Sequence, residues 1–427
     1  MFDLIWRKIL HMKEGESEGA FMDSGTAMND DKAAVDVTLI GTLPPLKGIS
    51  PYCAELASIL SEHLEIEFID FKRLYPEILY PGKTCEDDLY PIDVAATKIK
   101  HRRILDVLNP FTWLKAGLSA RGYIVHAQWW TGLLFPVYMI VLGIARLRGK
   151  RIIITVHNVD PHEGGSLLRF LNCLILPLGD EFIVHGESCR EKLVKRVRSR
   201  KAVHVVPHPP FRSAQEAYDD NVDVEAIRRE LGLREGETLL IFFGNIRDYK
   251  GLDVLLRALP EVREVCSEAR LLVAGECWGD WGRYERIIHE EAVEDMVITR
   301  LGYLPYKKLE GYILASDLAV FPFTHLDSAS SSVTLALSLG KSIVVSEVGD
   351  MAELRRHGVQ MARPGCPASL AETIALALRR DNAGNRLTPP DAALSAEYAH
   401  KTAEGHILAY WGCGHDADTG GLGGSEP

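Results

Sequence analysis

Two stretches in the second half of the chain combine residue types that could bind an anion. One is a polar loop of small residues at 327–332 that leads into an apolar run of helix formers at 333–339. The first backbone N–H groups of a helix have no partner inside it and the helix dipole adds positive charge there, so small side chains would let a phosphate come close. The other stretch is the loop 244–250, which brings Arg247 and Lys250 ahead of a second apolar run. The alternatives are a serine-capped surface helix and a solvated loop.

Polar side chains in the first half follow a strongly β-branched run at 151–156. His157 comes directly after this run, and His162 and Glu163 lie on the next loop. Ligands of open parallel sheets bind at the carboxyl ends of strands, so these side chains are candidates to face a ligand. A lone histidine is more often structural. Trp129, at the end of another β-type run, would either stack on a sugar or pack in the core.

β-type runs and helical stretches alternate twice along the chain. The first set of β-type runs lies at 35–40, 66–71, 123–127, 151–156, 181–185 and 202–207. The pattern restarts after a charged stretch, with runs at 238–243, 270–275, 297–302, 318–322 and 343–345. This alternation predicts an α/β protein with two tandem, doubly wound, Rossmann-like domains. We expect them to face a cleft that holds the ligand.

Composition narrows the class of protein. The chain has 427 residues, of which 47% are hydrophobic and 25% charged, and its net charge of −11 argues against a nucleic-acid binder. The eight cysteines show no metal-type spacing, which indicates free thiols in a reducing compartment and no bound metal. The most apolar window, 133–147, is too short to span a membrane, and no secretory signal is evident. We therefore expect a cytoplasmic protein.

The segment 243–256 resembles the phosphate-binding segment of group 1 retaining glycosyltransferases of the GT-B fold. This family includes glycogen synthase-like enzymes and lipopolysaccharide mannosyltransferases. Its segment usually reads Gly-Arg-x-x-x-x-Lys-Gly, and here it reads Gly-Asn-Ile-Arg-Asp-Tyr-Lys-Gly. The stretch 327–345 is similar to the family's Glu-x7-Glu block ahead of a Gly-Lys-Pro-Val-Val strand. The two segments at this distance carry the resemblance, which covers about residues 35–411.

Three positions depart from the family pattern. Asn245 stands where the family has Arg, and Arg247 is the cation that could replace it. Leu335 stands where the family has the second Glu, which holds the donor ribose, so the ribose must be held in some other way. Ser330 stands at the usual glycine of the phosphate loop, while the next two serines can still offer backbone N–H groups.

The resemblance also implies a role for each candidate residue. Catalytic roles fall to His157, near the reacting sugar, and Asp327, on the donor sugar hydroxyls. His162 and Glu163 could orient the acceptor. The implied donor-binding residues are Gly48, Gly244, Asn245, Arg247, Lys250, Tyr303, Ser330, Ser331 and Ser332.

The implied organisation has six parts. They are a disordered extension at 1–33, an acceptor-side domain at 34–211, a linker at 212–236, a nucleotide-sugar domain at 237–390, a C-terminal helix at 391–411 that crosses back to the first domain, and a disordered tail at 412–427. Two basic segments, 98–115 and 190–201, stand out against the acidic total. They favour peripheral contact with anionic lipid, each charge contributing about 1 kcal/mol, although solvated helix faces explain them equally well.

The resemblance thus implies a retaining, metal-independent glycosyltransferase without a further cofactor. It would move a sugar from a nucleoside diphosphate sugar to a saccharide or polyprenyl-linked saccharide, in cell-surface polysaccharide or glycolipid synthesis. Attack on the face of the leaving group and closure that expels water complete the expected mechanism. A sugar-nucleotide epimerase and a phosphorylase share the architecture, and the residues at 245 and 335 favour a non-catalytic sugar-nucleotide-binding protein. A dehydrogenase is disfavoured because no G-x-G-x-x-G follows the first strand.

Overall fold

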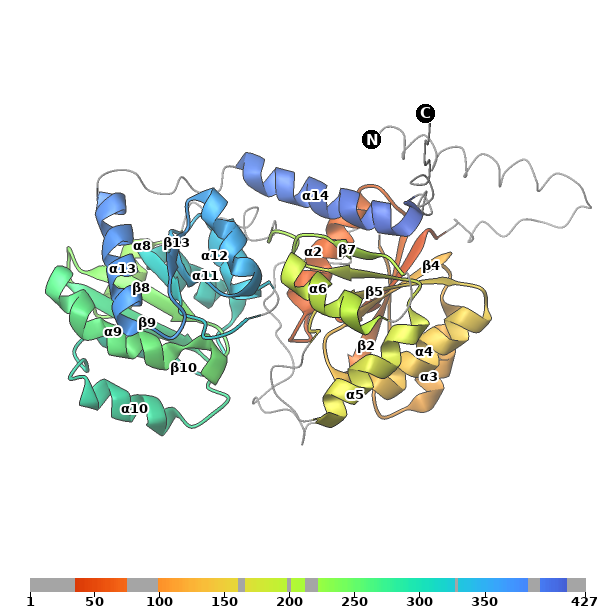
Figure 1. Ribbon diagram of the computed structural model, residues 1–427, viewed down its shortest axis with the longest axis horizontal. Coiled ribbons are helices and arrows are strands. Elements are labelled where there is room, and N and C mark those ends of the chain that lie inside the picture. The colour runs from red at the N-terminus through yellow and green to blue at the C-terminus, as the bar shows by residue number, and fades with distance from the viewer. Residues whose placement is uncertain are drawn as a thin grey trace, which may run out of the picture.

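The computed structural model describes residues 35–74, 99–159, 166–197, 201–211, 222–326, 329–382 and 392–412. The expected extension at 1–33 and all of the expected tail except Gly412 lie outside these ranges. So do three candidate site residues, His162, Glu163 and Asp327. Figure 1 shows two α/β bodies side by side, one from each half of the chain.

The first sheet is parallel throughout, in the order β3-β2-β1-β4-β5-β6-β7. Its strands are β1 (Val37–Gly41), β2 (Ile66–Arg73), β3 (Lys100–Asp106), β4 (Ile124–Trp129), β5 (Arg151–Val156), β6 (Glu181–Val184) and β7 (Val203–Val205). Its helices are α2 (Ser50–Ser61), α3 (Pro110–Ser119), α4 (Phe135–Leu147), α5 (Ser166–Ile175) and α6 (Glu187–Arg196), with 3-10 turns η3 (Gly132–Leu134) and η4 (Leu176–Leu178). The strand order reverses between β1 and β4, where such sheets bind ligands.

The second sheet is also parallel, in the order β10-β9-β8-β11-β12-β13. Its strands are β8 (Thr238–Phe243), β9 (Ala269–Gly275), β10 (Val297–Leu301), β11 (Leu318–Phe321), β12 (Ile343–Ser346) and β13 (Gln360–Ala362). Its helices are α8 (Val224–Glu230), α9 (Leu252–Val265), α10 (Trp281–Glu290), α11 (Tyr306–Ala315), α12 (Ser331–Ser338) and α13 (Pro367–Asn382), with 3-10 segments η5 (Asp248–Lys250) and η6 (Gly349–His357). The predicted pair of doubly wound parallel sheets is confirmed.

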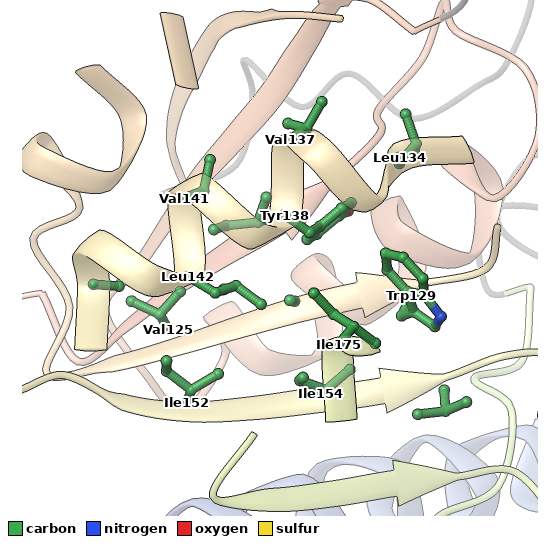
Figure 2. Close-up of a cluster of buried hydrophobic side chains, with 14 of the residues drawn as sticks. Val125, Trp129, Leu134, Val137, Tyr138, Val141, Leu142, Ile152, Ile154 and Ile175 are labelled. Carbon is green, nitrogen blue, oxygen red and sulfur yellow. The ribbon is translucent and has the colours of Figure 1, made fainter. Parts of the chain in front are cut away.

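Each sheet is buried on both faces, which explains the continuous apolar runs of its central strands. In β5, Ile152 and Ile154 belong to the core under α4, while Ile153 points into the core on the opposite face. Figure 2 shows the first of these cores, where strand side chains meet Tyr138 and Leu142 of α4. The alternation follows from the two-residue period of a strand.

The elements β3 and α3 were not predicted, because the segment 98–115 reads as a basic surface. In the structure, two cations of β3 pair with buried carboxylates on β2. Arg102 donates to Glu67 Oε1 at 2.8 Å, and Arg103 donates to Asp70 Oδ2 at 2.7 Å. Arg102 and Arg103 are therefore paired within the sheet, and these two cations do not contribute to a free basic surface. Helix α10 and strand β13 were not predicted either.

Helix α14 (Ala392–Trp411) follows the second domain and packs against α2, β6 and β7 of the first. Figure 1 shows it running along the top of the molecule toward the first sheet. Its face toward that sheet is buried, including Thr402, His406 and Tyr410. In the described part of the chain, no helix has the length and apolar character needed to cross a bilayer.

Candidate functional site

The loop after β8 folds back on itself, so that Lys250 at its end lies close to Gly244 at its start. Gly244 has a φ of +93° and Gly251 a φ of +71°, a backbone region that side chains rarely adopt. A Cβ on Gly251 would also lie 1.9 Å from the carbonyl oxygen of Pro322 at the end of β11. A Cβ on Gly244 would lie 2.9 Å from Lys250 Nζ. The two glycines therefore let the loop fold tightly, with the Lys250 amino group over the carboxyl end of β8.

The amino group of Lys250 also lies at the start of α12. Its Nζ is 3.5 Å from the hydroxyl of Ser332, and the Ser330 side chain caps the helix by accepting from the N–H of Val333. The Lys250 side chain is buried, and burial together with the nearby Arg247 lowers its pKa to about 8. A buried ammonium beside a helix N-terminus attracts an incoming anion. The two stretches found separately in the sequence thus meet at one point.

The second cation of the loop is held by an aromatic ring. The guanidinium carbon of Arg247 lies 3.9 Å from the ring centroid of Trp278. Stacking of this kind fixes the guanidinium plane, so that the N–H groups at its edge can donate to a phosphate. Asn245, two residues earlier, is exposed on the same loop.

Three histidines lie on the side of the first domain that contacts the second domain. His157 follows β5, His185 follows β6 and His208 follows β7, and their rings surround Tyr52 of α2 at centroid distances of 4.6, 5.1 and 5.0 Å. Desolvation lowers the pKa of His185 to about 4 and that of His208 to about 3, and it holds the pKa of His157 well below its usual range. All three imidazoles are therefore neutral at neutral pH, able to accept and donate hydrogen bonds without carrying charge.

Three contacts join the two domains near the histidines and Lys250. His208 accepts a hydrogen bond from Ser331 at the start of α12, which links the histidines to the residues around Lys250. In a second contact, the amino group of Lys47 lies over the ring of Tyr303, and Lys47 precedes Gly48 (φ +95°). The distances are 3.3 Å from Ser331 Oγ to His208 Nε2, 3.3 Å from Lys47 Nζ to the Tyr303 ring centroid, and 2.9 Å from the Ser188 backbone nitrogen to Asp350 Oδ1.

The structure thus places most of the site residues that were predicted from the sequence. The structure gathers Gly244, Lys250, Ser330, Ser331 and Ser332, and it places His157 in the facing histidine group. Arg247 and Asn245 stand on the same loop, while Tyr303 contacts Lys47, the neighbour of Gly48, at a different place. His162, Glu163 and Asp327 lie outside the described residues.

One candidate is excluded by its burial. Trp129 is 1% exposed and packs edge-on to Tyr138 (Figure 2), with the ring centroids 5.6 Å apart. Its indole N–H donates to Asn172 Oδ1 at 3.2 Å. Its ring is part of the core and cannot stack on an acceptor. Leu335, at the position of the family's ribose-binding acid, is also buried in a core.

Tyr52, His185 and His208 were not predicted from the sequence as site residues. A usable signal was present, because His157, His185 and His208 each follow a β-type run, where the carboxyl edge of a parallel sheet would place them together. The assembled site pairs buried positive charge on one domain with neutral imidazoles on the other. Across the described ranges, no group of three or more His, Cys, Asp or Glu side chains is arranged to hold a metal ion.

The second half of the chain matches a known family. Residues 223–389 match the model described as "Glycosyl transferases group 1". A D-inositol 3-phosphate glycosyltransferase of Segniliparus rotundus is 34% identical over 132 residues, which is 30% of this chain and 29% of that protein. The lipopolysaccharide 1,2-N-acetylglucosaminetransferase of Salmonella typhimurium is 27% identical over 214 residues, or 48% of this chain and 54% of that protein. The chain thus spans between about a third and a half of the relatives it matches.

Solved structures match over nearly the whole chain. HepE of Anabaena in complex with UDP-glucose has a TM-score of 0.61 at 13% identity, covering 88% of this chain and 97% of HepE. WaaG, a glycosyltransferase involved in lipopolysaccharide biosynthesis, has a TM-score of 0.53 at 12% identity, covering 86% of this chain and 94% of WaaG. At these identities the likeness shows a shared fold.

Proposed function

We propose, from the premise that this chain has the GT-B fold and carries a group 1 glycosyltransferase domain at 223–389, that it is a retaining glycosyltransferase using a nucleoside diphosphate sugar. One observation carries the proposal. The buried ammonium of Lys250, the backbone of Gly244 and the Ser332 hydroxyl converge at the N-terminus of α12. A diphosphate placed there would meet a point charge, a close backbone approach and free helix N–H groups together.

The leaving diphosphate gains charge as the bond to the sugar breaks. We propose that Lys250, Arg247 and the α12 dipole stabilise this charge, so that the reaction proceeds without a metal ion. Lys250 is suited to this because its amino group is desolvated, and electrostatic interactions strengthen where water is excluded. The contacts of Ser331 and Lys47 across the two domains support closure over the bound donor.

Retention requires that the acceptor attack from the face on which the diphosphate leaves. The bond from the sugar C1 to the phosphate oxygen breaks, a bond from C1 to the acceptor oxygen forms, and the acceptor proton passes to the departing phosphate. The low pKa of His157 favours this route, because a neutral imidazole with so low a pKa is a weak base. In this scheme His157 orients sugar hydroxyls and does not remove the proton.

Binding and product analysis test the proposal. Thermal-shift measurements against UDP-, GDP- and ADP-sugars identify the donor, because a bound ligand stabilises the protein by mass action. Transfer in EDTA, with the product anomer read by NMR, then tests metal independence and retention. Lys250→Ala should lower turnover about a hundredfold or more. Epimerised donor without an acceptor would establish the epimerase instead, and binding without turnover on a panel of acceptors would leave a binding protein.

We also propose that the acceptor is a lipid-linked saccharide and that the enzyme works at the inner face of the membrane. The support is an apolar stripe on the outward side of α3, at the helical spacing of one face. Phe111 is 80% exposed, Leu114 42% and Leu118 61%, whereas Trp113 and Ala116 are buried against the domain. Large apolar side chains gathered on one exposed helix face are typical of an interaction surface.

The cations beside this apolar stripe favour an anionic lipid surface as its partner. Lys115 stands within the stripe, and the exposed cation Arg121 follows the C-terminal end of α3, in a protein of net charge −11. Apolar side chains bordered by cations suit anionic headgroups. The segment 190–201 supports this less than its sequence suggests, because Arg196 and Lys201 donate to backbone carbonyls of the domain.

Sedimentation with vesicles tests this surface. The wild-type protein should pellet with phosphatidylglycerol vesicles and stay in solution with phosphatidylcholine alone. Phe111, Leu114 and Leu118, each changed to Ser, should abolish pelleting while transfer to a water-soluble acceptor continues. The control variant has Ser at two exposed apolar positions of the second domain, Val265 (49% exposed) and Leu376 (47% exposed), and this variant should still pellet. Undiminished binding by the α3 variant would refute the assignment.

A further inference from the structure

Helix α6 of the first domain begins without a cap from its own N-cap residue. That residue is Gly186, which has no side chain, so the N–H groups of the first turn need an acceptor from elsewhere. The acceptor comes from the second domain, because Asp350 Oδ1 lies 2.9 Å from the backbone nitrogen of Ser188. A carboxylate in this place also suits the positive end of the helix dipole. One domain thus supplies the cap of a helix in the other.

Gly186 leaves the space that this carboxylate fills. Its φ of −165° is extended backbone that any residue adopts, so the backbone conformation does not require glycine. A Cβ at this position, however, would lie 1.8 Å from Asp350 Oδ2 and 2.0 Å from Asp350 Cγ. Serine is among the preferred N-cap residues, but its side chain would exclude the carboxylate. The turn therefore admits the acceptor of the other domain in place of a cap of its own.

Both partners of this contact are anchored in their own domains. Asp350 lies in the first turn of η6, next to Met351, which is 5% exposed in the core of the second domain. Gly186 directly follows His185, whose ring centroid lies 5.2 Å from that of His157. Figure 1 shows α6 on the side of the first body that is nearest to the second. The contact therefore joins the core of the second domain to the turn that carries one of the three histidines.

We propose that Asp350 is a positioning residue that aligns the two halves of the site by capping α6 from the second domain. This inference rests on the proposed function, in which the donor diphosphate lies at Lys250 and the histidines face the sugar. The contacts of Ser331 and Lys47 also join the domains, but they end on side chains. The contact of Asp350 ends on a backbone N–H whose position the helix fixes, and the charge of the carboxylate strengthens it.

Asp350→Ala tests the proposal in the full chain. Loss of the carboxylate should raise the radius of gyration in solution scattering and lower kcat about tenfold or more, because catalysis falls steeply when reacting groups are misplaced. The KM for the donor should stay within about threefold of wild type, since the proposed diphosphate ligands all lie on the second domain. Asp350→Asn should keep the wild-type radius and kcat, because its amide oxygen can still accept from Ser188.

Two further variants separate positioning from helix capping. Asp280→Ala is the matched control, because Asp280 caps α10 within the second domain by accepting from the Gly282 N–H at 3.0 Å. It should lose stability while its radius of gyration and kcat stay at the wild-type values. Gly186→Ser combined with Asp350→Ala gives α6 a cap of its own. The double variant should regain protection of the α6 amides from hydrogen exchange without regaining the wild-type radius or kcat.

The outcomes separate this inference from the proposed function. A wild-type radius of gyration and kcat in Asp350→Ala would overturn the inference and leave the transferase intact. Recovery of kcat in the double variant would also overturn it, since Asp350 would then act only through the stability of α6. If the wild-type protein transfers no sugar, the proposed function fails, and scattering by the same variants still decides whether Asp350 aligns the domains.

Discussion

Replacing Lys250 by methionine should stabilise the empty protein while disabling the proposed donor site. The pKa of Lys250 is about 8 in the folded chain, below its ordinary value of 10.5, so folding disfavours its charged form. At pH 7 the lysine is protonated in both states, and the folded state bears a cost of about 3 kcal/mol. The cost shrinks as pH rises from about 8 and is gone above about 10.5. Loss of the Ser332 hydrogen bond removes about 1 kcal/mol of the gain.

The net gain of about 2 kcal/mol corresponds to a rise in Tm of roughly 5 °C for a domain of this size. Donor binding changes in the opposite sense. In the proposed function the buried cation faces a diphosphate, so its removal should weaken donor affinity and turnover about a hundredfold or more, which corresponds to about 3 kcal/mol. The same lysine would thus lower stability and support function, as expected of a charge held in place for a ligand.

Scanning fluorimetry between pH 6 and 10, with and without the preferred nucleotide, measures both effects. Wild type should gain Tm above pH 8 and gain further with nucleotide, whereas Lys250→Met should start higher and show neither gain. Lys341→Met is the matched control, because Lys341 donates to two backbone carbonyls at the end of α11 and should lose stability with donor binding intact. A less stable Lys250→Met protein that still binds nucleotide would refute the reasoning.

Three further predictions follow from local geometry. Gly244→Ala should weaken nucleotide binding at least tenfold by calorimetry, because the added methyl would lie 2.9 Å from Lys250 Nζ at a φ of +93°; unchanged affinity would contradict the site. Gly186→Ala should hold the domains apart, since its methyl would lie 1.8 Å from the Asp350 carboxylate, and the radius of gyration in solution scattering should rise while transfer falls. His185→Gln should flatten the loss of stability between pH 6.5 and about 4, measured by urea unfolding, because the unfolded histidine gains a proton in that range and the folded one does not; an unchanged pH slope would exclude His185 as its source.

Much of the second domain could be predicted because its site is built from short segments. The turn that returns Lys250 to β8 needs only glycines at the right positions, and the start of α12 needs only small polar residues before an apolar run. Local rules of this kind are visible in a single sequence. The replacements at Asn245 and Leu335 were equally visible there.

Two features of the first domain could not be predicted from the sequence, because they depend on contacts between residues far apart in the chain. The basic run 100–103 has no apolar strand pattern, and it forms β3 because Glu67 and Asp70 on β2 supply buried partners. Trp129 could equally have faced a ligand, and only the packing of Tyr138 and the Asn172 hydrogen bond place it in the core.

The amino-acid sequence by itself determined two α/β sheets, the loop and helix start that form the anion site, and the strand ends that bear histidines. Periodicity, glycine positions and capping residues act over a few neighbouring residues, so each is readable without the fold. Only the tertiary structure decided which of these ends meet. Ser331 reaches His208, and Tyr410 reaches His126 across 284 positions of the chain, because sheet order and the return of α14 set those distances.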